Sequence, residues 1–188
     1  MTRQFTTILG YKNLGFLIAV FSLLFSADSC RPARGDHVLD TWEASNQTFK
    51  VRIRKFDENA SVVLGHNYFT VEAAASGSNK WHEFLAWRAD NGGSIPRDRV
   101  QFVDHQTAYA FINSEYAVTT DAGHTWTVWD ARKHVTNPKY LDQTLIKEVH
   151  LASDGRGRMT VGYPTESGPA LAELSTTDYG AHWLSDVK

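Results

Sequence analysis

The chain has 188 residues and a formal net charge of −2, from 19 Lys and Arg against 21 Asp and Glu. Without a basic excess the composition speaks against nucleic-acid binding, which relies on clustered Lys and Arg to neutralise phosphates. One cysteine excludes an intrachain disulfide, so packing must hold the fold together, and the six Trp, seven Tyr and ten Phe can supply it.

The chain begins with a segment typical of export. Arg3 and Lys12 precede an apolar run over residues 14–25, and this run is shorter than the roughly 20 residues that a membrane-spanning helix needs. A basic segment followed by a short apolar one is typical of a secretory signal. We therefore expect residues 1–29 to be a signal peptide and the protein to be exported.

The only cysteine, Cys30, directly follows this segment. The run Phe25–Cys30 resembles the lipobox of bacterial lipoproteins, although Ala27 stands where that family prefers a branched aliphatic residue. The resemblance implies that Cys30 is acylated and that 30–47 is a lipid-anchored tether. Since Arg31 rather than an aspartate follows, resemblance to Gram-negative sorting implies the outer membrane, facing the periplasm. The alternative is ordinary cleavage near Ala27, which leaves Cys30 as a free thiol.

A β-domain is expected over residues 48–188. Its first strand alternates apolar and basic side chains with a period of two, which predicts one buried face and one solvated basic face. The buried side carries Phe49, Val51 and Ile53, and the basic side carries Lys50, Arg52 and Arg54. Later strands are expected at 61–64, 67–74, 81–88, 100–104, 107–112, 115–119, 126–130, 145–152, 158–163, 170–176 and 182–185. Helix signals are weak, so the fold class is all-β.

Two copies of one turn motif lie between these strands. Thr119–Trp126 and Thr176–Trp183 both read Thr-Thr-Asp-x-Gly-x-x-Trp. The Asp can accept backbone N–H groups and close an Asx-type turn, and the Gly supplies a positive φ. The Trp buries its ring while its indole N–H seeks an acceptor. The residues expected to form these structural turns are Asp121, Gly123, Trp126, Asp178, Gly180 and Trp183.

The motif resembles the Asp box, or BNR repeat, of sialidases and related β-propeller proteins. The resemblance implies that each box joins the last two strands of a four-stranded blade, away from any catalytic centre. A weaker third copy ends in Ser76–Trp81 and lacks the Asp. The Trp residues at 81, 126 and 183 are 45 and 57 residues apart, which fits one blade per repeat.

The number of blades limits the architecture. A closed propeller needs at least about four blades, and at the observed period the chain without its signal peptide has room for about three and a half. We expect an incomplete or minimal β-propeller-like array of about three antiparallel blades. A twisted β-sandwich that uses the same Asp-box hairpins is the alternative, and closure by a partner chain is also open.

No catalytic constellation is visible. A sialidase needs three arginines converging on a carboxylate, a Tyr–Glu nucleophile pair and an acid/base Asp on a six-bladed ring, and this chain is about half that length. The eight histidines lack the spacing of zinc ligands, and neither a P-loop nor a G-x-S-x-G elbow is present. We expect no catalytic residue, no metal and no cofactor.

One cluster of aromatic and charged residues could bind a partner. It comprises Trp81, Trp87, Arg88, Arg97 and Arg99, near a Gly-rich connector. Trp and Arg dominate the hot spots of protein interfaces and suit sugar stacking, although core aromatics beside a charged loop are the alternative.

The docking site is expected in the loops 89–99 and 131–144, because long irregular segments are commonly functional. Replacing Arg97 or Arg99 by Ala should weaken partner binding and leave the fold intact, whereas Arg52 on the strand face should not matter.

The sequence therefore predicts a non-catalytic envelope lipoprotein that binds a protein partner. A toxin-neutralising immunity protein is one concrete version. The alternatives are a glycan-binding or sialidase-like module, and an assembly factor resembling Asp-box photosystem assembly proteins. The membrane contact is expected through the N-terminal lipid alone.

Overall fold

The computed structural model describes residues 34–58, 67–89, 93–134 and 143–185. These ranges are all-β apart from two short 3-10 helices, η1 (Arg97–Arg99) and η2 (Ala131–His134), so the predicted fold class is confirmed. No helix within them is long and apolar enough to cross a membrane. The expected signal peptide, Cys30 and the strand expected at 61–64 lie outside the described residues.

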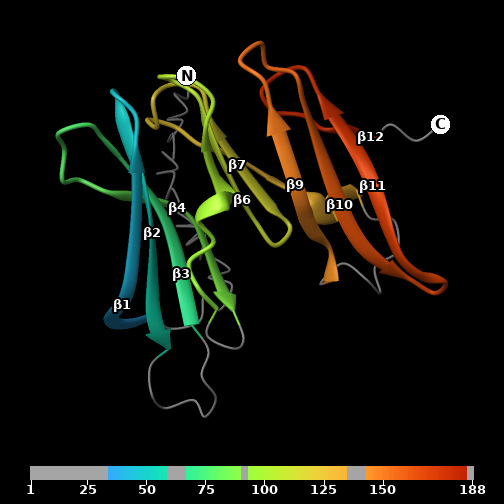
Figure 1. The fold of residues 1–188 in the computed structure, drawn as a ribbon, viewed down its shortest axis with the longest axis horizontal. Helices are drawn as coiled ribbons and strands as arrows, with labels where there is room; N and C mark the ends of the chain where they lie inside the picture. Colours follow the sequence, from blue (N-terminus) through green and yellow to red (C-terminus); the bar gives the residue numbers. More distant parts are fainter. Residues whose placement is uncertain (1–33, 59–66, 90–92, 135–142, 186–188) are drawn as a thin grey trace, which may run out of the picture. The chain divides into compact units, whose positions relative to one another are not determined.

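The strands form three antiparallel sheets of four strands each. In each sheet, strands adjacent in sequence are adjacent in space, as Figure 1 shows, and no sheet closes on itself. The first sheet contains β1 (Arg34–Ser45), β2 (Phe49–Glu58), β3 (Asn67–Ala75) and β4 (His82–Ala89). The second contains β5 (Val100–Phe102), β6 (Ala108–Ile112), β7 (Glu115–Thr119) and β8 (Thr127–Asp130). The third contains β9 (Leu145–Leu151), β10 (Gly157–Thr165), β11 (Gly168–Thr176) and β12 (Leu184–Ser185). The prediction of about three antiparallel blades is thereby confirmed.

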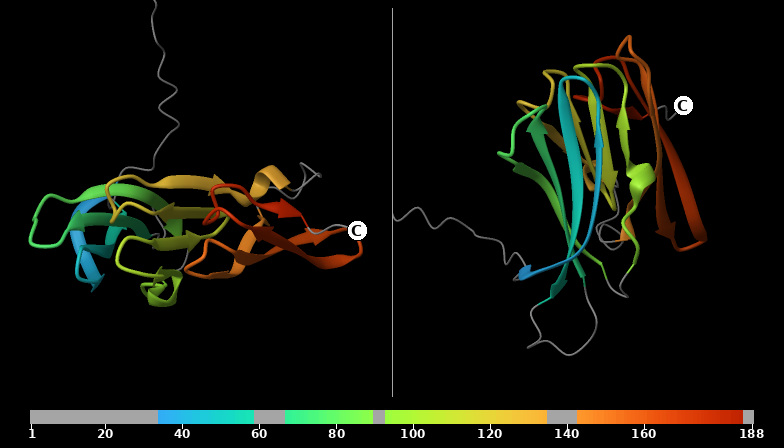
Figure 2. Two further views of the ribbon diagram at one scale, coloured as in Figure 1. Left: turned by 90° about the horizontal axis from the view of Figure 1, so that it is seen from above. Right: turned by 60° about the vertical axis from the view of Figure 1, so that its left-hand side comes forward.

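Strand β1 corrects the expected domain boundary. The tether expected over 30–47 is wrong for residues 34–45, which pair with β2 in the first sheet (Figure 2). Trp42 pairs with Ile53 and packs on the first core, which explains the strand. A register shift between Val38 and Asp40 breaks the alternation there, so a period-two pattern is hard to detect in sequence.

Two core clusters lie on opposite faces of the second sheet. The first core cluster joins the first and second sheets and consists of Phe49, Val51, Ile53, Phe69, Val71, Ala73, Leu85, Ile95, Val100, Ala108, Ala110 and Ala117. The second core cluster joins the second and third sheets and consists of Tyr109, Phe111, Tyr116, Val118, Trp129, Ala131, Ile146, Val149, Met159, Val161, Leu174 and Trp183. Strand β6 serves both, with alanines toward one cluster and aromatic rings toward the other, because successive side chains of a strand point to opposite faces.

A second turn, whose repetition the sequence analysis missed, joins the first two strands of each sheet. Asn46, Asp104 and Asp154 each accept a backbone N–H two residues further on, at 2.9, 2.7 and 3.1 Å. This is the Asx-turn geometry.

The turn between the third and fourth strands bonds to this first turn in every sheet. Ser76 N–H donates to Thr48 O, Ala122 N–H to Gln106 O and Tyr179 N–H to Gly155 O, each at 2.9 Å. We call this bond the clasp. It ties the two turns at one end of a sheet together.

Candidate functional site

The first copy of the turn motif, Thr119–Trp126, forms the turn between β7 and β8. We call this copy the first box and Thr176–Trp183 the second box. Asp121 Oδ1 accepts from Thr119 Oγ1 at 2.8 Å and from Thr125 N–H at 2.9 Å, and Oδ2 accepts from Thr125 Oγ1 at 2.6 Å. Burial opposes the ionisation of Asp121, but the hydrogen bonds from Thr125 and Thr119 outweigh it and lower its pKa. The carboxylate is therefore engaged within its own turn.

The second box repeats this arrangement between β11 and β12. Asp178 Oδ1 accepts from Thr176 Oγ1 at 2.8 Å and from His182 N–H at 3.0 Å, and Oδ2 lies 2.6 Å from His182 Nδ1. Burial again opposes ionisation, but the bonds from His182 and Thr176 lower the pKa of Asp178 to about 2. His182 thus takes the place of Thr125.

The glycines of the boxes do more than allow a positive φ. The residue before each also has a positive φ, 57° at Ala122 and 60° at Tyr179, which sequence reasoning did not foresee. A Cβ on Gly123 would lie 2.9 Å from Phe49 Cδ2, and one on Gly180 would lie 2.6 Å from Tyr116 Cε1. Each glycine therefore lets the turn lie against an aromatic ring of the preceding sheet.

The tryptophans of the boxes also pack on the preceding sheet. Trp126 stacks on Phe84 with centroids 3.7 Å apart. Trp183 is 2% exposed and meets Tyr116 edge-on at 5.3 Å. The expectation that their indole N–H groups find acceptors is wrong among the described residues, where both Nε1 atoms are buried without a hydrogen bond. Ring packing, rather than hydrogen bonding, places them.

The predicted binding cluster does not come together. Trp87 stacks on Phe69 at 4.7 Å beside the first core cluster, so its ring is part of the packing. Arg88 is exposed on β4, and Arg97 is exposed on η1. Trp81 lies apart from them, against Lys50 and Arg52.

Arg99 connects η1 to the third sheet. Its Nη1 lies 3.3 Å from the carbonyl oxygens of Ile146 and Lys147, and its guanidinium lies 4.7 Å from the Phe111 ring centroid. The side chain thus joins η1 to β9, and the expectation that Arg99→Ala leaves the fold intact stays a prediction.

A cluster that the sequence analysis did not single out lies on the face of the first sheet opposite the first core cluster. At its centre, Glu72 Oε2 accepts from Arg52 Nε at 2.8 Å and Nη2 at 2.6 Å. Glu72 Oε1 accepts from Arg54 Nε at 2.8 Å, from Arg54 Nη2, and from Thr70 Oγ1 at 2.8 Å. We call these residues, together with Trp81 and Lys50, the Glu72 cluster.

Glu72 is ionised although it is buried. Its side chain is 3% exposed, against 20% for Arg52 and 22% for Arg54. Burial raises the pKa of Glu72, but hydrogen bonds from Arg54, Arg52 and Thr70 outweigh it and lower the pKa. The expected solvated basic face is therefore wrong for these two arginines, which are largely buried and paired.

Aromatic rings cover both guanidinium groups. Arg52 lies 4.0 Å from the Trp81 ring centroid and Arg54 lies 4.9 Å from that of Phe56. Lys50 Nζ also approaches Trp81, at 4.7 Å, and lies 3.8 Å from Glu43. Cation–π contacts of this kind gain strength when the cation is desolvated, so the cluster is held in one arrangement.

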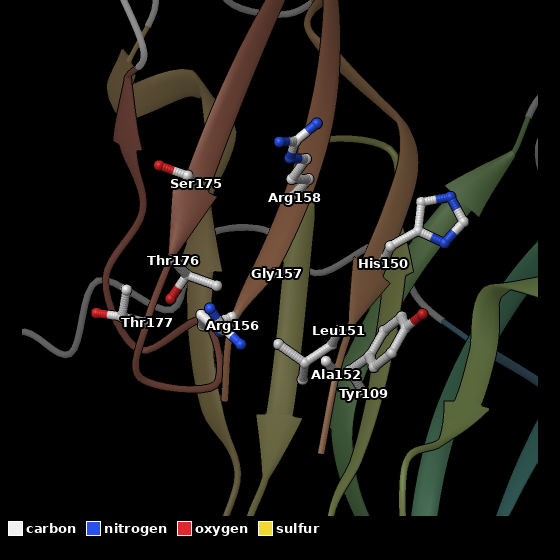
Figure 3. A pocket seen from close by; sticks show the side chains of 10 residues that line it. All are labelled: Tyr109, His150, Leu151, Ala152, Arg156, Gly157, Arg158, Ser175, Thr176 and Thr177. Carbon is white, nitrogen blue, oxygen red and sulfur yellow. The ribbon is translucent and has the colours of Figure 1, made fainter. Parts of the chain in front are cut away.

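The third sheet carries an open groove of about 630 Å³ (Figure 3). His150, Arg158 and Ser175 lie on three neighbouring strands in register. Several of the other polar side chains at the groove are already paired. The Tyr109 hydroxyl donates to Val149 O at 2.9 Å, Arg156 Nη2 lies 2.6 Å from Asp154, and Thr176 Oγ1 donates to Asp178 Oδ1 at 2.8 Å.

Sequence alone contained one signal for the Glu72 cluster. Glu72 is an acidic residue within the apolar run of β3, and a carboxylate there needs a partner because burying an unpaired charge is costly. Arg52 and Arg54 on the neighbouring strand are the available cations.

Searches against family models, curated proteins and solved structures gave no match. Across the part of the chain that the structure describes, no group of three or more His, Cys, Asp or Glu could hold a metal ion.

Proposed function

We propose that the protein is a non-catalytic binding module of the bacterial envelope, exported and attached to the outer membrane through acylated Cys30, which binds a protein partner through the Glu72 cluster. The observation that carries this proposal is the pairing of two largely buried arginines with one carboxylate and two aromatic rings on a sheet face. A toxin-neutralising immunity protein is one concrete form of such a module.

The composition of the cluster supports binding. Trp and Arg dominate protein-interface hot spots, which are well packed and largely desolvated. Ordering a long side chain at an interface costs free energy, and Glu72 already holds Arg52 and Arg54 in place. Binding through these arginines therefore avoids much of that cost.

The loop 89–99 is a weaker candidate for the docking site. Arg99 of that loop bonds to carbonyl oxygens of the third sheet, so its side chain is already used within the molecule. The proposal accordingly moves from this loop to the strand face that carries Arg52.

Site-specific photo-crosslinking tests the docking face. A photoreactive residue is placed at Thr41, which is exposed and pairs with Arg54 in register, and for comparison at Leu171, which is 67% exposed on the third sheet. In cells of the source organism, we expect a discrete protein adduct from position 41 and none from 171. An adduct from 171 alone, or none from either, contradicts the proposal.

Metabolic labelling with a palmitate analogue tests the anchor. We expect the wild-type protein to be labelled and Cys30→Ser to be unlabelled, because the thiol is the acylation site. Two or more acyl chains give stable attachment, at about 0.8 kcal/mol per buried methylene. An unlabelled wild-type protein contradicts the lipoprotein assignment.

Glycan binding is the second candidate, supported by the half-buried Trp81 ring beside Arg52 and Lys50. A glycan that stacks on Trp81 should change its fluorescence, and Trp81→Phe should abolish that change. An unchanged spectrum on addition of envelope glycans argues against this candidate.

A further inference from the structure

We infer that the Glu72 cluster recognises an extended acidic segment of the partner protein, with carboxylates on alternate residues. This inference rests on the proposed function and names the chemistry of the partner. It follows from the hydrogen-bond donors, the burial and the spacing of Arg52 and Arg54.

The two arginines keep hydrogen-bond donors for a second carboxylate. Glu72 engages Nε and Nη2 of each guanidinium. A guanidinium has five N–H donors in a fixed fork, and no hydrogen bond to either Nη1 occurs within the described part of the chain. Each arginine therefore has a donor edge left, and such an edge matches the planar geometry of a carboxylate.

The guanidinium groups, rather than a net positive charge, attract an anion here. Lys50, Arg52 and Arg54 carry three positive charges on this face, and Glu43, Glu72 and Glu83 carry three negative ones, with Glu83 in register with Glu72 on β4. The rings over Arg52 and Arg54 exclude water from one side of each guanidinium. Attraction between charges is stronger where water is excluded, so an incoming carboxylate gains more here than at a solvated arginine.

The spacing selects an extended segment. Arg52 and Arg54 are two residues apart on β2 and point to one face, so their backbone positions are about 6.6 Å apart. An extended partner chain places the side chains of alternate residues at the same spacing. Carboxylates at positions i and i+2 of such a segment can therefore each meet one arginine.

Titration calorimetry of the protein purified from the membrane in detergent tests this inference, first with two synthetic peptides. Both contain the same numbers of Glu and Thr, in strict alternation in one peptide and in two separate blocks in the other. We expect the alternating peptide to bind about tenfold more tightly than the blocked one, and a peptide with Gln in place of Glu not to bind. Equal binding of all three peptides overturns the inference.

Arg52→Lys and Arg54→Lys keep the charge but lose the fork, and each should weaken binding of the alternating peptide about tenfold. Arg156→Lys is the matched control, because Arg156 also pairs with a carboxylate, that of Asp154, but lies in the turn between β9 and β10. The affinity of this variant for the alternating peptide should not change. Lys50→Gln, which leaves the Arg–Glu72 bonds in place, should weaken binding severalfold and covers the case in which an arginine variant fails to fold. Wild-type affinity in Arg52→Lys, Arg54→Lys and Lys50→Gln contradicts the inference.

Two further outcomes separate this inference from the function on which it rests. An adduct at position 41 without peptide binding contradicts recognition of an acidic segment and supports the protein-binding function. Peptide binding without an adduct supports recognition of acidic segments and contradicts the proposed envelope partner. Binding of anionic lipid vesicles as tight as that of the peptide would assign the cluster to a membrane surface and overturn the inference.

Discussion

The first and second boxes make the same turn from different side chains. Asp121 is bonded by the hydroxyl of Thr125, whereas Asp178 is bonded by the imidazole of His182 at the same offset, and both O···donor distances are 2.6 Å. The turn therefore needs a hydrogen-bond donor four residues after the Asp, and either a hydroxyl or an imidazole can supply it. This is why the repeated motif leaves that position variable while the Asp stays.

The third copy of the motif shows what the boxes do beyond the turn. Gly77 has a φ of 77°, like Gly123 and Gly180, but no atom lies within 4 Å of where its Cβ would be. The two full boxes instead meet Phe49 and Tyr116 of the sheet before them. A box therefore serves both as a turn and as a contact between sheets, and Gly77 serves only the turn.

The largest loss of stability should come from the box glycines, which serve both the turn and the contact with the preceding sheet. Gly180→Ala should cost about 3–4 kcal/mol of unfolding free energy, since the methyl group meets Tyr116 at 2.6 Å and the φ is positive. Gly123→Ala should cost about 2–3 kcal/mol, and Gly77→Ala only about 1 kcal/mol from its φ. Urea denaturation measures all three. Equal losses would show that the ring contacts contribute nothing.

Replacing the aspartates of the two boxes should cause the second-largest loss of stability. Asp121→Ala and Asp178→Ala should each cost about 1–3 kcal/mol, because backbone and side-chain donors of the turn lose their acceptor. Neither should alter partner binding in protein that remains folded. Thermal melts beside a binding assay check both statements, and binding lost at an unchanged melting temperature would give the boxes a direct role in recognition.

The smallest predicted effect is on the unfolding free energy at acidic pH. The pKa of Asp178 is lowered from 3.8 to about 2 in the folded protein, so its ionised form stabilises the fold above about pH 4. That contribution is lost as the pH falls through the folded pKa. Unfolding free energies between pH 5 and 2 should therefore decline less steeply in Asp178→Asn than in wild type. Identical slopes would mean that Asp178 is not linked to folding.

Local rules predicted the repeated parts of this fold. The strands of the second and third sheets were placed within a few residues, because period-two patterns and turn residues mark them. Strand β1 was missed because its alternation is interrupted between Val38 and Asp40. Asp154-Gly155 marked a hairpin turn in the sequence, but the recurrence of this turn at Asn46, Asp104 and Asp154 was missed because the three share a side-chain function and not a residue identity.

The candidate site depended on contacts between strands, which local patterns do not encode. Arg52 looked solvated from its alternation with apolar residues, but Glu72, twenty residues later, pairs with it. Arg99 looked like a loop residue free to bind a partner, but it reaches carbonyl groups some fifty residues away at Ile146 and Lys147. Pairings at such separations follow from sheet register and sheet stacking.

The clasp has a consequence for how such a chain changes over evolutionary time. Its donor and acceptor lie within one sheet, from Ser76 to Thr48 in the first and from Tyr179 to Gly155 in the third. A segment encoding one sheet therefore contains everything needed to join its own turns. Duplication or loss of such a segment adds or removes a clasp as a whole and leaves those of the other sheets intact.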